Sequence, residues 1–342
     1  MLLKRLTEAS GLPGNEKEIR DIIKDEITEY VDEIKVDRLG NLIAIKQGKE
    51  GYPRVMLAAH MDEIGLMVKS IDEGGFIKFV PVGGIDDRIL VSKVVHIGNN
   101  KIPGVIGAKA IHLQELDERE KALKHKQLYI DIGAKSKAEA EKLVSKGDYI
   151  SFVSDYVEFG NNLVKAKALD DRVGCSILVE LLKEAYDATI CAVFSVQEEI
   201  GLRGARVAAY GINPDFALVL EGTVCSDVSN VDEAQYGTRL GHGPALSIMD
   251  MASLFDKGLT KRIHQIAVDN NINIQFRQIA TGGNDAGSIH LTREGIPSAA
   301  LSIPCRYIHS PASIMSKDDY DGCRKLMQLF LKSIEKEAYA RG

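Results

Sequence analysis

Residues 188–201, "ATICAVFSVQEEIG", join an uncharged, strand-like run to two adjacent glutamates and a glycine. The run 188–196 is almost entirely apolar, which is typical of a strand covered on both faces. An amphipathic helix is predicted before it, over 170–185, and a second helix after it, over 203–211. A strand between two such helices indicates a parallel sheet with helices on its faces.

The same alternation extends in both directions along the chain. Near the N-terminus a helix is predicted over 15–31 and a hairpin over 33–48. Further strands are predicted at 54–60, 215–220, 272–279 and 297–304, and further helices at 259–271, 285–295 and 317–340. The sequence therefore predicts an α/β fold with a mostly parallel sheet flanked by helices.

Residues 69–162 have a different character. Short β-rich pieces such as "GGFIKFVPVGG" and "KIPGVIGA" are separated by glycines, with one helical stretch at 136–147. This pattern predicts a small β-rich domain inserted into the larger one. The expected domains are thus 1–68 together with 163–342, and 69–162.

Composition excludes several classes of protein. The 342 residues are 45% hydrophobic and 27% charged, with a net charge of −6, which gives no reason to expect nucleic acid as a partner. No apolar run approaches the ~20 residues that a membrane helix needs, and the N-terminus does not resemble a signal peptide. The five cysteines are odd in number and form no CxxC pair, so reduced thiols in a cytoplasmic protein are expected.

Histidines and carboxylates follow several of the predicted strands. His60 and Asp62 follow 54–59, Glu198 and Glu199 follow 188–196, Glu221 follows 215–220, and His309 follows 297–304, while Asp170 begins a predicted helix. In open α/β sheets the carboxyl ends of the parallel strands meet at one edge, where ligands bind. We therefore expect these side chains to converge on one site.

Each residue alone also has a structural explanation. Asp170 can cap its helix, Asp62 and Glu221 can hydrogen-bond in turns, and paired glutamates are usually solvated. Together, however, two histidines and several carboxylates are the right ligands for two divalent ions that share a water. Because neighbouring side chains of a strand point to opposite faces, Glu198 and Glu199 are expected to differ in role, one binding an ion and the other moving a proton.

With these residues placed, the chain resembles the tetrahedral (TET-type) metallo-aminopeptidases, also called glutamyl or deblocking aminopeptidases. The motifs "AAHMDEIGLMV", "PVGGIDDRIL", "KALDDRVGC", "SVQEEIGLRGA", "TGGNDAGSIH" and "IHSP" occur in the order found in that family. The resemblance covers nearly the whole chain. It implies a dinuclear-metal aminopeptidase that removes N-terminal residues from short peptides.

The resemblance also implies a role for each matching position. One ion would be held by His60, Asp170 and Glu221, and the other by Asp170, Glu199 and His309. Glu198 would be the general base toward a bridging water and then the general acid, and Asp62 would orient His60. The implied cofactors are two divalent ions per subunit, Zn or Co, with Mn as an alternative.

The family pattern further implies that the inserted domain serves assembly, with dimers forming a tetrahedral dodecamer. The chain departs from the pattern at Glu221, where many members have Asp, and at Asp171, where many have Asn. A carboxylate is kept at Glu221, and Asp171 is not assigned to a metal.

Three other functions remain open from the sequence. A deacylase or carboxypeptidase can use the same ligands, and some relatives carry an endoglucanase label, although a glycosidase needs two carboxylates and no histidines. A metal-binding assembly subunit without activity is the third. Substrate preference is also open: Arg88, Arg239 or Arg277 can favour acidic side chains, or each can form an ordinary salt bridge.

Overall fold

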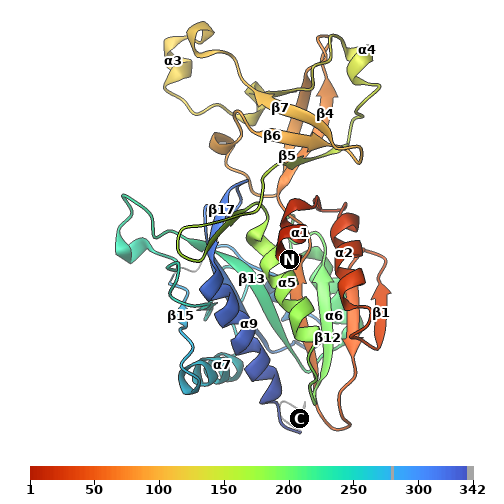
Figure 1. Ribbon diagram of the computed structural model, residues 1–342, viewed down its shortest axis with the longest axis vertical. Coiled ribbons are helices and arrows are strands. Elements are labelled where there is room, and N and C mark those ends of the chain that lie inside the picture. Colours follow the sequence, from red (N-terminus) through yellow and green to blue (C-terminus); the bar gives the residue numbers. More distant parts are fainter. Residues whose placement is uncertain (279–280, 337–342) are drawn as a thin grey trace.

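The computed structural model describes residues 1–278 and 281–336 and consists of two parts (Figure 1). A large α/β unit contains both ends of the chain, and a small antiparallel barrel lies beyond one end of it. The barrel is formed by residues between the third and tenth strands of the chain, so it interrupts the α/β unit in sequence.

Within the described residues the large sheet has 11 strands, nine of them in the order β1-β2-β12-β3-β13-β16-β17-β11-β10. The strands are β1 (Glu33–Val36), β2 (Leu42–Lys46), β3 (Arg54–His60), β10 (Val157–Phe159), β11 (Leu163–Ala166), β12 (Thr189–Ser195), β13 (Phe216–Cys225), β14 (Ala245–Leu246), β15 (Gln275–Phe276), β16 (Ser298–Arg306) and β17 (Ser313–Ser316). Strands β12, β3, β13 and β16 are parallel and form the centre of the sheet, with antiparallel strands on both sides. The predicted fold class is confirmed, and the predicted hairpin is β1 paired with β2.

The apolar runs that predicted the central strands are buried. In β12 every residue from Ile190 to Ser195 is buried, and in β3 every residue from Val55 to His60 is buried. The two strands pair in register, with Ala192 beside Leu57. Burial on both faces explains why these segments are apolar throughout, without the alternation of a half-exposed strand.

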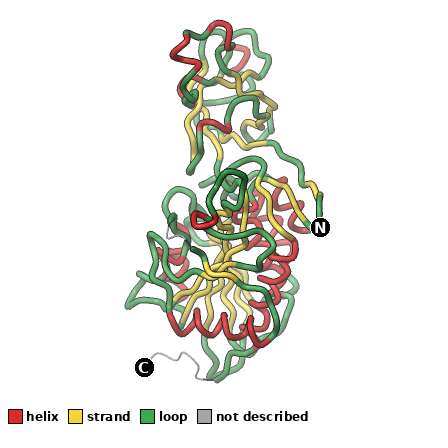
Figure 2. Tube along the Cα trace, turned by 90° about the vertical axis from the view of Figure 1, so that its left-hand side faces the viewer, coloured by secondary structure: helices red, strands yellow, loops and turns green. Residues whose placement is uncertain are grey.

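Helices cover both faces of the sheet, and Figure 2 shows the strands running between them. One face packs against α1 (Leu2–Glu8), α2 (Lys17–Ile27), α5 (Leu169–Leu182), α7 (Lys257–Asp269) and α9 (Lys317–Lys332), and the other against α6 (Arg203–Ile212) and α8 (Ala286–Ile289). Helix α2 shows why the helices pack against the sheet: Ile19, Ile23 and Ile27 recur every four residues, so they lie on one side of the helix, and all three are fully buried. The shared hydrophobic cores therefore set the three-layer architecture.

Several predicted elements are shorter than expected. The helical stretch predicted at 136–147 contains only α4 (Lys137–Ala140). The strand predicted at 272–279 contains only β15, and its residue 279 lies outside the described residues. The helix predicted at 285–295 contains only α8. The helix predicted at 317–340 corresponds to α9, which ends at Lys332. Residues 337–340 of that prediction lie outside the described part of the chain.

The small barrel is closed in the order β4-β5-β8-β7-β6-β9. Its elements are β4 (Gly65–Ile71), β5 (Ile77–Val82), β6 (Val94–Ile97), β7 (Ile102–Gly107), β8 (Tyr129–Asp131), β9 (Tyr149–Phe152), α3 (Leu116–Arg119) and α4 (Lys137–Ala140). Its own hydrophobic core is separate from those of the large sheet. The barrel strands thus begin at Gly65 and end at Phe152, while β10 pairs with β11 in the large sheet.

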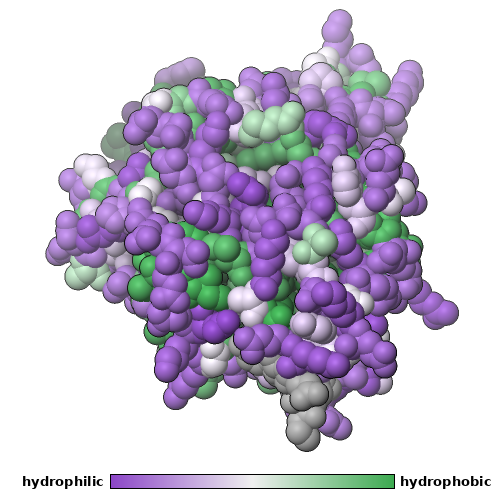
Figure 3. All heavy atoms as spheres, turned by 60° about the horizontal axis from the view of Figure 1, so that its bottom comes forward, coloured by the Kyte–Doolittle hydropathy of each residue, from purple (hydrophilic) through white to green (hydrophobic). Residues whose placement is uncertain are grey.

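The end of the molecule opposite the barrel is covered mostly by hydrophilic side chains, with smaller hydrophobic areas between them (Figure 3). In the described part of the chain, no helix is both long and apolar enough to cross a membrane. All five cysteines are free and buried, as the sequence predicts.

Candidate metal centre

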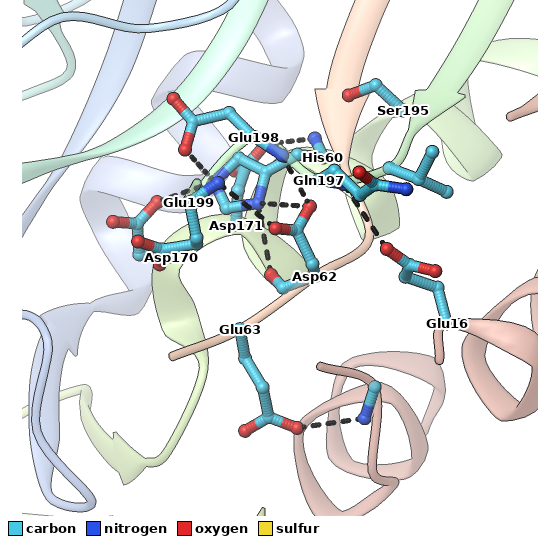
Figure 4. A network of polar contacts seen from close by, with 12 residues as sticks. Glu16, His60, Asp62, Glu63, Asp170, Asp171, Ser195, Gln197, Glu198 and Glu199 are labelled. Carbon is cyan, nitrogen blue, oxygen red and sulfur yellow. Dashed lines mark hydrogen bonds and ion pairs between the residues drawn. The ribbon is translucent and has the colours of Figure 1, made fainter. Parts of the chain in front are cut away.

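The candidate ligands lie where the central strands of the sheet end, and Figure 4 shows His60 there beside Asp170. His60 is the last residue of β3 and pairs with Ser195, the last residue of β12. The sequence predicts that Glu221 follows the end of its strand. Instead, Glu221 lies inside β13, which continues to Cys225. Strand β13 pairs in parallel with β3, with Val219 beside Ala58, so Glu221, two residues further along, lies at the level of His60.

His60 is the centre of one group of ligand atoms. Its Nε2 lies 3.2 Å from Asp170 Oδ1 and 3.3 Å from Glu221 Oε1. His60 is 1% exposed and Glu221 6%, so both side chains are removed from water. Among the described residues the buried Glu221 Oε2 has no hydrogen-bond partner, which leaves a carboxyl oxygen that a cation would satisfy.

His309 is the centre of a second group, in the loop between β16 and β17. Its Nε2 lies 3.3 Å from Asp170 Oδ2 and 3.4 Å from Glu199 Oε2, and its Nδ1 lies 2.9 Å from the carbonyl oxygen of Gly84. The two oxygens of Asp170 therefore face different histidines. These contacts bring together all five residues that the sequence proposes as ligands. Histidine and carboxylate groups are able to bind a divalent metal ion, and His60, Asp170 and Glu199 lie close enough together to do so.

Asp170 is free for this role because its neighbour caps the helix. Both Asp170 and Asp171 have non-helical backbone angles at the start of α5. Asp171 Oδ1 accepts the N–H of Gly174 at 3.0 Å, and its Oδ2 accepts the N–H of His60 at 3.1 Å. Asp171 also lies near His60 and Glu221, but both of its oxygens are already engaged. The alternative that Asp170 is the cap is wrong.

The division between Glu198 and Glu199 has a different cause from the one predicted. Strand β12 ends at Ser195, so the two glutamates lie in a loop and strand alternation does not apply. Gln197 has a φ of 57°, in the left-handed region, which turns the chain after the strand. Glu199 then reaches His309, while Glu198 Oε2 lies 3.9 Å from His60 Nε2 and contacts neither group closely.

Asp62 anchors this loop. Its Oδ1 accepts the N–H of Glu198 and its Oδ2 the N–H of Glu199, both at 3.0 Å. The main-chain carbonyl oxygen of Asp62 lies 3.0 Å from His60 Nδ1, whereas its carboxylate Oδ1 lies 3.6 Å from the same nitrogen. Asp62 thus contacts His60 mainly through its backbone and the glutamate loop through its side chain.

Burial and close charges shift the titration of these groups. Burial raises the pKa of Glu199 to about 8 and raises the pKa values of Glu198 and Glu221 well above their ordinary range. Burial opposes the charged form of His309, but Asp170 and Glu199 outweigh it and raise its pKa to about 9. The histidines in turn lower the pKa of Asp170, although its burial acts in the other direction. Without a metal the site therefore holds protons, and divalent ions would replace them.

Sequence reasoning missed the buried ion pairs that hold the Asp170 segment. Lys167 Nζ lies 2.8 Å from both oxygens of Glu63, and Arg172 Nη2 lies 3.3 Å from Glu63 Oε1. Lys167 and Arg172 stand on either side of Asp170 and Asp171 in the sequence, so Glu63 fixes both ends of that turn. The sequence does contain an indication of these ion pairs, because Lys167 and Arg172 flank two aspartates in an otherwise apolar stretch.

A second missed contact joins the barrel to the site. The carbonyl oxygen that faces His309 belongs to Gly84, in the loop "GGIDD" that follows β5. A third involves Asp285, whose Oδ2 accepts the hydroxyl of Ser195 at the end of β12. Neither contact could be predicted from the sequence. Every residue has a backbone carbonyl, and the residue type of a serine does not show which partner its buried hydroxyl contacts.

Comparison with known proteins agrees with this geometry. Relatives cover nearly the whole chain. One from Acetivibrio thermocellus is 44% identical over 95% of this chain and 96% of its own length. The lysyl aminopeptidase of Pyrococcus furiosus is 33% identical over 98% of this chain and 97% of its own length. The glutamyl aminopeptidase of Lactococcus lactis is 31% identical over 99% of this chain and 97% of its own length.

Solved structures give the same picture. A TET aminopeptidase from a marine sediment thaumarchaeon has a TM-score of 0.95 and 35% identity, covering 98% of this chain and 96% of that one. The TET1 peptidase of Pyrococcus horikoshii, which assembles into a tetrahedron or an octahedral shell, has a TM-score of 0.86 and 33% identity over 97% and 99%. A protein named endoglucanase from Thermotoga maritima has a TM-score of 0.81 and 36% identity over 96% of both chains.

The family model for M42 glutamyl aminopeptidases matches residues 40–326, from β2 through most of α9. This span includes the barrel and every residue of the candidate centre. Peptide hydrolysis is therefore the activity that the family, the relatives and the site have in common. The chain belongs to the M42 glutamyl aminopeptidase family.

Proposed function

We propose that this chain uses two divalent ions to remove N-terminal residues from short peptides. His60, Asp170 Oδ1 and Glu221 would hold one ion, and His309, Asp170 Oδ2 and Glu199 the other. The observation that carries the proposal is the division of Asp170, whose oxygens lie 3.2 Å from His60 Nε2 and 3.3 Å from His309 Nε2. Zinc–ligand bonds of 2.0–2.2 Å in a tetrahedron separate two ligand atoms by about 3.4 Å, which is close to these distances.

The residues also fit divalent ions in chemistry. Each group offers one imidazole nitrogen and two carboxylate oxygens, which suit Zn or Co and also accommodate Mn. The unpartnered buried oxygen of Glu221 supports the presence of a cation beside it. Bound ions would supply Lewis acidity, polarising the scissile carbonyl and lowering the pKa of water.

Glu198 would move the proton. It lies outside both groups, with Oε2 3.9 Å from His60 Nε2, and only 11% of its side chain is exposed. In this role it accepts a proton from the water that attacks the carbonyl carbon. It then donates that proton to the amine nitrogen as the C–N bond breaks. Asp62 would keep Glu198 in place by accepting its backbone N–H.

Analysis of products tests this function. The protein is stripped with a chelator, reloaded separately with Zn, Co or Mn, and incubated with a short peptide. Release of the N-terminal residue, lost with the chelator and restored by metal, supports the proposal. Release of an acyl group or a C-terminal residue would instead indicate the deacylase or carboxypeptidase alternative, and cleavage of cellulose the endoglucanase alternative.

We also propose that the inserted unit, predicted at residues 69–162, serves assembly into dimers and a tetrahedral dodecamer. Exposed apolar side chains support this role: Ile111 is 67% exposed, Leu113 61% and Leu116 77%. The TET1 peptidase of Pyrococcus horikoshii assembles into a tetrahedron, and it is similar to this chain over nearly its full length. A measured particle mass of twelve chains would support the proposal, and a monomer would contradict it. The five unpaired cysteines support a cytoplasmic location.

A further inference from the structure

The loop that carries Glu198 and Glu199 is held by side chains from distant parts of the chain. Four consecutive backbone N–H groups each donate to such a side chain: Val196 to Asn41 Oδ1 at 3.0 Å, Gln197 to Glu16 Oε1 at 3.2 Å, and Glu198 and Glu199 to the two oxygens of Asp62 at 3.0 Å. None of the three accepting side chains is more than 3% exposed. The proposed mechanism gives a role to Asp62 and leaves Glu16 and Asn41 unassigned.

Glu16 reaches this loop from the segment that precedes α2. Figure 4 shows its carboxyl group directed toward Gln197. The same oxygen, Oε1, also accepts the N–H of Gly14 at 2.7 Å. Gly14 has a φ of 86°, so the chain turns there and its N–H points back toward the Glu16 side chain. One acceptor atom therefore joins this turn to the loop that carries Glu198.

Helix α2 fixes the position of Glu16. The backbone carbonyl of Glu16 accepts the N–H of Arg20 at 3.0 Å in the first turn of the helix. Arg20 Nη1 in turn donates to the carbonyl of Gly40 at 2.9 Å. Gly40 directly precedes Asn41, the side chain that holds Val196. The beginning of α2 thus supports two of the four contacts.

Gln197 is the residue of the loop whose backbone most needs support. Its φ of 57° lies in the left-handed region, which residues other than glycine rarely adopt. Such a conformation persists only where the surrounding contacts determine it. The carbonyl of Gln197 accepts a long hydrogen bond of 3.3 Å from the N–H of Arg203, and its N–H donates to Glu16. Because Gln197 directly precedes Glu198, a change in its backbone angles would move the Glu198 side chain.

The contact depends on the oxygen of Glu16 and not on its charge. Burial raises the pKa of Glu16, and the nearby charge of Asp62 acts in the same direction, whereas the N–H of Gly14 opposes them. The surroundings therefore disfavour the charged form. An uncharged side chain of the same length, with an oxygen in the same place, can accept both N–H groups equally well.

We propose that Glu16 is a positioning residue for Glu198: through the N–H of Gln197 it fixes the loop so that the Glu198 side chain stays beside the metal centre. The inference rests on the proposed function, because it assumes that Glu198 moves the proton. Glu199 keeps its own hydrogen bond to Asp62, so loss of the Glu16 contact should lower kcat without releasing metal. The segment before α2 thus takes part in turnover without touching substrate or metal.

Two conservative variants separate the reach of Glu16 from its charge. Glu16→Gln keeps the length and an accepting oxygen but loses the charge, and Glu16→Asp keeps the charge but withdraws the oxygen by one methylene. For the metal-loaded protein we expect kcat of Glu16→Gln within about twofold of wild type and kcat of Glu16→Asp about 10- to 100-fold lower, as for a catalytic group displaced by about 1 Å. KM and metal content should not change. Glu18→Asp is the matched control, because the oxygens of Glu18 accept from Ser10 and Lys101 instead.

Hydrogen exchange separates this inference from the proposed function. Measured by mass spectrometry on the metal-loaded protein without substrate, it reports how firmly the N–H groups of residues 196–199 are held. We expect faster exchange there in Glu16→Asp and wild-type exchange in Glu16→Gln, whatever reaction the protein catalyses. That result, with no release of N-terminal residues by the wild type, would contradict only the proposed function. Equal exchange in all three proteins, equal kcat in all three, or a loss of kcat in Glu16→Gln as large as in Glu16→Asp would overturn the role of Glu16.

Discussion

Asp62 holds the backbone of Glu198: its buried Oδ1 accepts the N–H of Glu198 at 3.0 Å. Its other oxygen holds Glu199 in the same way, also at 3.0 Å. One side chain thus fixes both the proposed base and a proposed ligand, although more than 130 positions separate it from them in sequence. This contact depends on both oxygens being acceptors, which only a carboxylate provides.

Asp62→Asn should therefore slow turnover without unfolding the protein. The amide offers one acceptor, so one of the two backbone N–H groups loses its partner. We expect kcat to fall about 10- to 100-fold, as for other residues that orient a metal site. Asp72→Asn is the control for the loss of charge alone, because Asp72 accepts two backbone N–H groups on one oxygen, both at 3.0 Å, in an exposed turn of the barrel, and an amide oxygen can still accept both. A kcat for Asp62→Asn within twofold of wild type would contradict this role.

Glu198→Gln should remove the proton carrier and keep the ions. We expect kcat to fall about 100- to 10,000-fold, the usual range for a general acid–base group, with unchanged metal content. Glu199→Gln is the paired variant: its side chain lies 3.4 Å from His309 Nε2, and its loss should release metal. Elemental analysis beside kinetics separates the two effects. Wild-type turnover in Glu198→Gln would rule out its assignment as the base.

The metal-free protein should lose stability as the pH rises. Asp170 and Glu199 raise the pKa of His309 from 6.5 to about 9 against the effect of burial, and burial raises that of Glu199 from 4.5 to about 8. Between about pH 4.5 and 9 the folded protein therefore binds more protons than the unfolded chain, first at Glu199 and above pH 6.5 also at His309, so its stability falls as the pH rises. The unfolding temperature in chelator should fall over this range, and by less after metal is added. A rise with pH in chelator would contradict the shifts.

Lys167→Met should destabilise the protein strongly. Lys167 is 3% exposed and lies 2.8 Å from both oxygens of Glu63, so its removal leaves a buried carboxylate with Arg172 as its remaining charged partner. Breaking a buried pair from one side costs about 3–5 kcal/mol. Lys101→Met is the matched control: Lys101 pairs with Glu18 at 2.9 Å on the surface and should cost less than about 1 kcal/mol. Denaturant unfolding of the two variants measures the difference, and equal costs would contradict this account of Glu63.

The sequence predicted the centre of the fold well because burial leaves a readable pattern. The apolar runs of β3, β12 and β13 and the isoleucine spacing of α2 all correspond to side chains with little or no exposure. The short elements were predicted less well. Strand β15 has two residues and helix α8 has four, so neither shows a full period of hydrophobic residues.

The site was predicted from convergence, but its details needed the backbone. His60 and Asp170 were expected to meet because they were placed at one edge of the sheet, and they lie 3.2 Å apart. The separation of Glu198 from Glu199 comes from a left-handed residue, Gln197, and from Asp62, neither of which strand periodicity describes. The carbonyl of Gly84 that faces His309 could not be predicted, because every residue has a carbonyl.

The central claim is that Asp170 stands between two cations. Anomalous diffraction from crystals of the Zn-loaded protein, collected above and below the zinc absorption edge, tests it directly. The account predicts two zinc peaks in each chain, one touching His60 and Glu221, the other touching His309 and Glu199, with one oxygen of Asp170 on each. Zinc on only one side of Asp170 at saturating concentration, or zinc bound elsewhere, would contradict it.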